Sequence, residues 1–174
     1  MDAIIVEQPA FRLVGHAVRL PLKHNGINPH VQSYNAAVSE AERARLRRIG
    51  NTEPTGLLQV SDDVDPDYVE GSEFTHLYGV SIDGLTPVPA NLHVIEAPAG
   101  KWAVFSAPGP SPLTWDTVAR EWFLENPWQI RPGPEIAANY HPDENDATST
   151  SYLWIPVERA GCRREPLHHG LSGR

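Results

Sequence analysis

The sequence predicts an α+β protein made of two similar units, each running strand, helix, strand, strand. The chain has 174 residues, which is enough for one domain with a sizeable core. Its 17 Pro and 13 Gly divide it into short segments, most of which are typical of strands. The same order of elements then occurs twice, without any repeat at the level of individual residues.

The first unit starts at residues 11–20 (FRLVGHAVRL), where loose alternation and β-branched residues predict a strand. Asn28 followed by Pro29 predicts the N-cap and first position of a helix. A capping box at Ser39 predicts that the helix restarts there after a bend. The unit closes with two predicted strands, at residues 56–62 and 74–83.

The second unit starts with a predicted hairpin, in which residues 92–98 and 101–107 flank a turn at Ala99-Gly100. Ser111-Pro112 predicts the second helix, and Asn126-Pro127 ends it. The last predicted strands are residues 135–140 and 149–158. We expect one domain at residues 1–158, with halves at about 3–83 and 92–158, followed by a mobile tail at 159–174.

The charge balance and the lack of targeting segments exclude several classes of protein. The chain has 14 Lys and Arg against 22 Asp and Glu, a net charge of −8, which opposes direct binding of nucleic acid. No apolar run is long enough to span a membrane, and the N-terminus lacks the features of a signal peptide. Cys162 is the only cysteine, so there is no internal disulfide. We therefore expect a cytoplasmic protein without membrane partners.

The chain shows none of the short motifs that mark nucleotide, zinc or serine-nucleophile sites. The acidic loop that begins at Asp63 has the odd-position spacing of a calcium loop. It departs from that motif at Tyr68, where Gly is required, and at Phe74, where Glu is required. We therefore predict neither a metal nor a cofactor.

Aromatic residues on strands are the most informative candidates for a binding site. In the last strand, Leu153, Ile155 and Val157 alternate with Tyr152 and Trp154. The aliphatic set is typical of a core-facing side, whereas rings with polar tips suit either a ligand pocket or a second packing interface. Both interpretations are open for each aromatic residue taken alone.

Five segments, in this order and spacing, resemble the GyrI-like effector-binding family over about residues 3–158. They are SEFTHLYGVSID, VIEAPAGKWAVFSAPGP, EWFLENPWQI, GPEIAANY and YLWIPV. The family comprises small-molecule-binding domains of AraC-type and MerR-type multidrug regulators and is also found alone. The resemblance implies a curved antiparallel sheet with two helices. It also implies a ligand, often an amphipathic or aromatic cation, held between the two halves.

The resemblance also places an acidic residue near position 138, where this chain has Ala137 and Ala138. Either Glu135 takes that role from a shifted register, or the pocket is less acidic, since a slip of one residue moves a side chain to the other face. The remaining candidates are aromatic. The full predicted set of ligand-binding residues is Tyr34, Tyr78, Trp102, Phe105, Trp122, Glu135, Tyr140, Tyr152 and Trp154.

Three functions are compatible with these features. The first is a stand-alone effector-binding or sequestering protein for a hydrophobic aromatic molecule, with a cationic ligand as one option and a separate regulator or a homodimer as partners. The second is a hydrolase of an aromatic, alkylating natural product. The third is a gyrase-inhibitor-like protein that binds a basic partner through acidic residues 53–73. The hydrolase would use Glu121 or Glu135 as acid or base and Tyr78 or Tyr140 to orient water.

Overall fold

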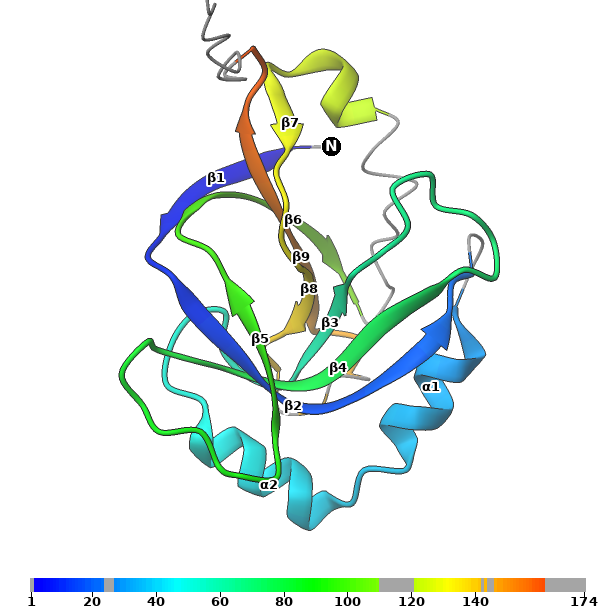
Figure 1. Ribbon diagram of the computed structural model, residues 1–174, viewed down its shortest axis with the longest axis vertical. Coiled ribbons are helices and arrows are strands. Elements are labelled where there is room, and N and C mark those ends of the chain that lie inside the picture. Colours follow the sequence, from blue (N-terminus) through cyan, green and yellow to red (C-terminus); the bar gives the residue numbers. More distant parts are fainter. Residues whose placement is uncertain (1, 24–26, 110–120, 142, 144–145, 162–174) are drawn as a thin grey trace, which may run out of the picture.

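The computed structural model describes residues 2–23, 27–109, 121–141, 143 and 146–161, and one curved antiparallel sheet forms its centre (Figure 1). The sheet order is β1-β6-β9-β8-β3-β4-β2-β5, and β7 pairs with β9. The predicted α+β class is confirmed. The strands are β1 (Ala3–Gln8), β2 (Phe11–Pro21), β3 (Leu58–Asp62), β4 (Glu73–Ile82), β5 (His93–Ala97), β6 (Gly100–Pro108), β7 (Trp128–Ile130), β8 (Glu135–Asn139) and β9 (Thr150–Arg159).

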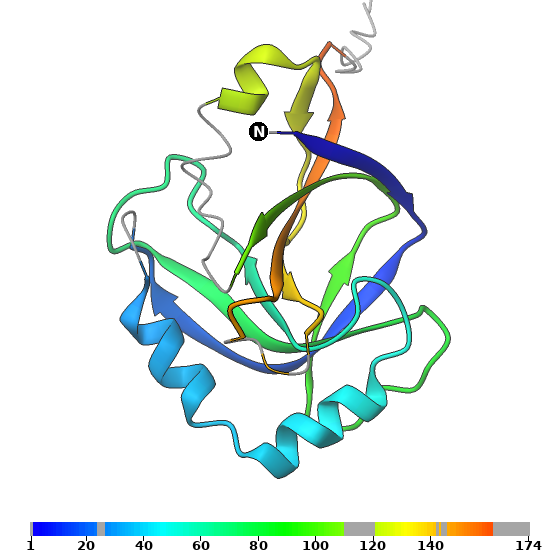
Figure 2. The same cartoon turned by 180° about the vertical axis from the view of Figure 1, so that it is seen from behind.

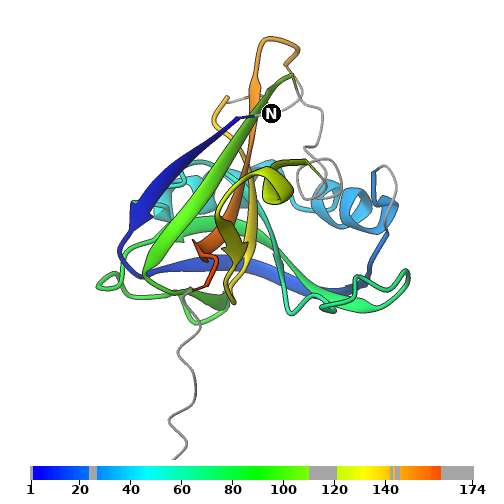
Figure 3. The ribbon, with the colours of Figure 1, turned by 90° about the horizontal axis from the view of Figure 1, so that it is seen from above.

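The strand order is symmetrical about its centre, where β3 pairs with β8. On one side follow β9, β6 and β1, and on the other β4, β2 and β5. The first strand of each half is therefore exchanged: β1 pairs with β6 of the second half, and β5 pairs with β2 of the first. Figure 3 shows β1 and β6 running side by side. The exchange joins the two halves at both edges as well as at the centre.

The hairpin predicted around Ala99-Gly100 is wrong, because β5 and β6 pair with other strands. β5 pairs with β2, whereas β6 lies between β1 and β9. Those two partners occupy both edges of β6 over most of its 9 residues, so no edge is left for β5. β5 and β6 are therefore consecutive in the chain but do not form a hairpin.

The first helical region contains two helices, α1 (Pro29–Ala36) and α2 (Glu40–Ile49), as predicted. Asn28 Oδ1 accepts the backbone N–H of His30, and Ser39 Oγ accepts that of Glu42. Residues 121–125 are also helical and lie at the opposite end of the sheet from α1 and α2 (Figures 1 and 2). The predicted start of that helix, and Cys162 with most of the tail, fall outside the described residues. No described helix has the length and apolarity that crossing a membrane requires.

Two glycines permit the close approach of β2 and β4. Gly15 and Gly79 are paired directly opposite each other. A Cβ at Gly79 would lie 2.0 Å from the carbonyl oxygen of Val14, and one at Gly15 would lie 2.2 Å from that of Tyr78. Any side chain here would force the strands apart, so these positions require glycine.

Among the described residues, apolar side chains form three clusters on the two faces of the sheet. The inner cluster fills the face away from the helices. On the other face, the Leu46 cluster lies under α2 and the Trp122 cluster lies under residues 121–125. The inner cluster contains Phe11, Leu13, Leu58, Val60, Leu77, Ile95, Ala97, Trp102, Ile136, Ala138 and Trp154. The Leu46 cluster contains Val14, Leu46, Leu57, Tyr78, Val80, Ile82 and Leu92, and the Trp122 cluster contains Ala103, Phe105, Trp122, Leu153, Ile155 and Val157.

Candidate ligand-binding site

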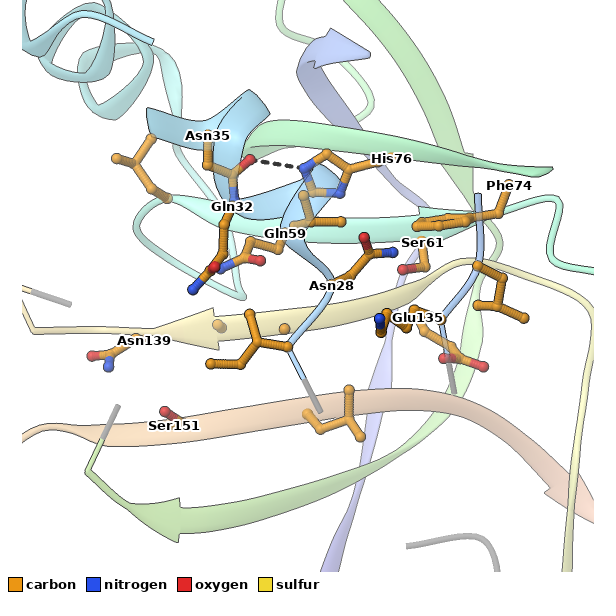
Figure 4. Close-up of a pocket in the computed structure, with 18 of the residues that line it drawn as sticks. Asn28, Gln32, Asn35, Gln59, Ser61, Phe74, His76, Glu135, Asn139 and Ser151 are labelled. Atoms are coloured by element: carbon orange, nitrogen blue, oxygen red, sulfur yellow. Dashed lines mark hydrogen bonds between the residues drawn. The ribbon is translucent and has the colours of Figure 1, made fainter. Parts of the chain in front are cut away.

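A cavity of about 630 Å³ lies on the helix-bearing face, over the central strands where the two halves of the sheet meet. Its lining comes from α1, β3, β4, β8, β9 and the loop between β3 and β4 (Figure 4). This volume is within the range of small-molecule sites. The cavity is therefore the candidate functional site.

The register of the central strands places a row of polar side chains on the floor of the cavity. Ser61 on β3 is paired with His76 on β4 and with Glu135 on β8. Gln59, two residues earlier on β3, is paired with Ala137. Because directly paired residues point to the same face, these side chains all face the cavity. Figure 4 shows Gln59, Ser61, His76 and Glu135 on the side of the sheet where α1 lies.

Glu135 is the acidic residue of this floor. The hydroxyl of Tyr68 donates to Glu135 Oε1 across 2.6 Å. Burial raises the pKa of the Glu135 carboxyl, and the hydrogen bond from Tyr68 lowers it in part. Burial and the adjacent carboxylate raise the pKa of Tyr68, so its hydroxyl remains a donor. No cationic side chain of the described chain forms an ion pair with Glu135.

His76 connects the floor of the cavity to α1. Its side chain is 1% exposed, and its Nε2 lies 2.8 Å from Oδ1 of Asn35. Burial lowers the pKa of His76 to about 4, so the ring is neutral at pH 7 and Nε2–H donates to the amide oxygen. The edge of the Tyr34 ring packs on His76, with 5.8 Å between ring centroids. These contacts hold α1 over the strands.

Two cationic side chains also line the cavity, and neither neutralises Glu135. The Arg43 guanidinium donates to the backbone oxygens of Asn35, at 2.9 Å, and Val38, at 3.2 Å, and lies over the Tyr78 ring. It thus fixes the junction between α1 and α2. Lys23 is exposed near the end of β2. Neither cation contributes to the pKa of Glu135.

The structure brings only part of the predicted site together. Glu135 faces the cavity, whereas Tyr152 borders it but is paired with Ala138 and packs against the inner cluster. Tyr34 packs on the lining residue His76, and Tyr140 stacks on Tyr152 with 4.6 Å between centroids. The other five predicted residues, Tyr78, Trp102, Phe105, Trp122 and Trp154, lie in the apolar clusters and are not part of the described lining.

Most polar residues of the cavity were not among the predicted site residues. The residues concerned include Gln32, Asn35, Gln59 and Ser61. For β3 a signal existed, because in LLQVSD the polar residues alternate with apolar ones. This alternation is equally typical of a strand with one face in water, and only the topology shows that β3 is central. Glu121, the other predicted acid of the hydrolase alternative, is exposed and lies outside the described lining.

The fold is an α+β domain with a cavity of ligand size where the two halves of its sheet meet. Residues 1–158 match the family of the GyrI-like small molecule binding domain, and the chain belongs to this family. It is therefore a small-molecule-binding domain, as the sequence resemblance predicted. A search of curated protein sequences finds no match.

Solved structures share the fold at low sequence identity. The structure of SAV2435 bound to tetraphenylphosphonium is 16% identical, with a TM-score of 0.70 over 91% of this chain and 94% of that chain. A structure from Staphylococcus aureus MU50 is 17% identical, with a TM-score of 0.63 over 91% and 99%. The C-terminal domain of EcmrR is 14% identical, with a TM-score of 0.60 over 91% and 98%.

Proposed function

We propose that this protein binds an aromatic small molecule that carries a positive charge, with Glu135 as the partner of that charge. The observation that carries the proposal is a partly buried carboxyl that faces a ligand-sized cavity and has no cationic partner from the described chain. Removing a carboxylate from water without a counter-charge is costly, and a ligand cation would offset that cost when it fills the cavity. The rings of Tyr68 and Phe74 in the lining supply aromatic surface.

The acidic loop between β3 and β4 favours a cation as well. This loop contributes Val64 and Tyr68 to the lining of the cavity. The segment from Asp62 to Glu73 contains six acidic residues and no Lys or Arg, although Asp63 pairs with Arg19 at 2.8 Å. A negative surface beside a cavity raises the local concentration of cations. The loop therefore supports the ligand charge that Glu135 suggests.

The structural relatives agree with this proposal. The solved structure of SAV2435 is bound to tetraphenylphosphonium, which is an aromatic cation. By analogy, this chain would act as a cytoplasmic effector-binding or sequestering protein that takes several aromatic cations, alone or with a separate regulator. A hydrolase acting through two carboxyls is less well supported, because Glu135 is the one carboxyl of the described lining.

Isothermal titration calorimetry with tetraphenylphosphonium and tetraphenylborate tests the charge preference. The two ions have nearly the same shape and opposite charge. We expect the cation to bind and the anion not to bind. In Glu135→Gln, which keeps an acceptor for Tyr68, the affinity for the cation should fall about 10–100-fold.

The matched control is Glu96→Gln, which removes the same charge from the exposed edge strand β5. Its affinity for tetraphenylphosphonium should remain that of the wild type. Equal binding of both ions, or an unchanged affinity in Glu135→Gln, would contradict the proposal.

A further inference from the structure

The polar groups of the cavity fall into two sets, and the difference indicates the chemistry of the ligand. In the first set, the groups are already used by the fold. Asn28 caps α1 and donates to the carbonyl of Pro21, and Asn139 donates to Ser149 Oγ. Ser151 donates to the carbonyl of Gly109, and Asn35 Oδ1 accepts from His76. These groups are structural.

In the second set, the side-chain groups make no hydrogen bond within the described chain. They are the amides of Gln32 and Gln59, the hydroxyl of Ser61, and Oε2 of Glu135, since Tyr68 donates to the other oxygen. Gln59 and Ser61 belong to β3 and Glu135 to the adjacent strand β8. The uncommitted groups are therefore concentrated at the junction of the two halves.

The strand register brings these groups within reach of one ligand. Ser61 is paired directly with Glu135, and such pairs have Cβ atoms about 4.5–5.5 Å apart. Next along β8, Ala137 offers only a methyl group, and Gln59 is paired with it. The space above Ala137 is thus bordered by the amide of Gln59 and the carboxyl of Glu135. A ligand seated there would meet an acid, an amide and a hydroxyl together.

A lipophilic quaternary cation is a poor match for this arrangement. It has no N–H or O–H donor, so it would displace water from Glu135 Oε2, Gln59 and Ser61 and replace no hydrogen bond. Each polar group left without a partner costs free energy, and the cost is greatest for a charged one. A protonated amine supplies both the charge and a donor.

We propose that the natural ligand is a protonated amine that donates an N–H to Glu135 Oε2 and carries hydroxyl or amide groups that bind Gln59 and Ser61. The pocket prefers such an amine to a quaternary cation of the same size. This inference rests on the proposed function, because it requires a cation at Glu135, but it specifies which kind of cation.

Three compounds on one scaffold test the inference. Propranolol is an aromatic secondary amine with a hydroxyl group. Its N,N-dimethyl quaternary derivative keeps the rings and the charge but has no N–H, and its deoxy analogue keeps the N–H but lacks the hydroxyl. We expect calorimetry to show that propranolol binds at least about tenfold more tightly than the quaternary derivative, as a charge-assisted hydrogen bond implies.

Two variants assign the preference to the proposed residues. In Glu135→Gln, the ratio of affinities between propranolol and its quaternary derivative should fall towards one. In Ser61→Ala, propranolol should weaken while its deoxy analogue is unchanged. Ser106→Ala, at an exposed position of β6, is the matched control and should change neither compound.

The outcomes separate the inference from the function on which it rests. If tetraphenylphosphonium binds through Glu135 and the quaternary derivative equals or exceeds propranolol, the inference is overturned and the proposed function stands. The inference is also overturned if tetraphenylphosphonium binds and no propranolol compound does. If no cation binds, both fail.

Discussion

The central strands present two opposite environments from alternate residues of the same sequence. On β8, Ile136 and Ala138 pack in the inner cluster, whereas Glu135 and Ala137 face the cavity. On β3, Leu58 and Val60 are fully buried, and the two polar residues that alternate with them face the cavity. Residues that are adjacent in the chain thus lie alternately in the apolar inner cluster and at the cavity. The face of the sheet on which a residue lies, more than its residue type, therefore decides whether it contributes to stability or to binding.

The two helices of the first half show the same contrast. α2 buries Leu46 over an apolar cluster, so apolar packing holds it to the sheet. The one buried residue of α1 is Asn35, and it is bound to His76 by a hydrogen bond. α1 is therefore a polar cover for the cavity, and α2 is a cover for the core.

Introducing Glu at Ala137 or at Ala138 should give the largest difference in stability between the two faces of β8. Ala138 is 5% exposed in the inner cluster, so Ala138→Glu buries a charge without a partner and should cost about 3–5 kcal/mol of the free energy of unfolding. Ala137→Glu places the same carboxyl in the open cavity and should change stability by less than about 1 kcal/mol. Urea denaturation measures both values.

The Ala137→Glu variant also tests the role of the cavity face in binding. Ala137→Glu adds a second negative charge beside Glu135 and should tighten the binding of tetraphenylphosphonium. If Ala137→Glu unfolds the protein as readily as Ala138→Glu does, the assignment of faces on β8 is wrong.

His76 belongs to the cavity face but is buried like a core residue, and its titration should show this. Its pKa in the folded protein is lowered from 6.5 to about 4 by burial. A lowered pKa contributes stability that is complete above pH 6.5 and is lost as the pH falls towards 4. The loss amounts to about 3 kcal/mol, at 1.36 kcal/mol for each pH unit.

The pH dependence of unfolding is best compared between the wild type and His76→Gln. Burial raises the pKa of Glu135, which gives a slope of opposite sign in part of this range, so the difference between the two proteins is the relevant quantity. His93→Gln, at an exposed position of β5, should keep the wild-type profile. A profile in His76→Gln identical to that of the wild type would show that His76 is not the source of the loss.

The smallest expected effects come from the two helix caps. Asn28→Ala and Ser39→Ala each remove a side chain that accepts a backbone N–H and should each cost about 1 kcal/mol of stability. Only Asn28→Ala should also weaken the binding of tetraphenylphosphonium, by a few-fold, because α1 carries Gln32 and Asn35 to the cavity. Thermal unfolding and calorimetry on both variants measure the two effects. Equal loss of binding in both variants would show that α1 has no special role as cover.

Local signals in the sequence determined most of the helices and strands. The caps at Asn28 and Ser39 set the starts of α1 and α2, because a cap acts through hydrogen bonds within a few residues. Alternation located the long strands, whereas β1 and the three-residue β7 were missed as strands. Glu135 was predicted as one of two alternatives, because the family resemblance places an acidic residue near Ala138.

Only the tertiary structure decided which strands pair and which residues form the cavity. The exchange of β1 and β5 between the halves depends on free sheet edges that are far apart in sequence, and it overrode the local turn signal at Ala99-Gly100. The aromatic residues Trp102 and Trp154 fit a pocket or a core equally well by type, and the packing of the whole sheet placed them in the inner cluster. The cavity itself is formed by α1 and four strands that come together only in the folded chain, so its polar character could not be read from any one segment.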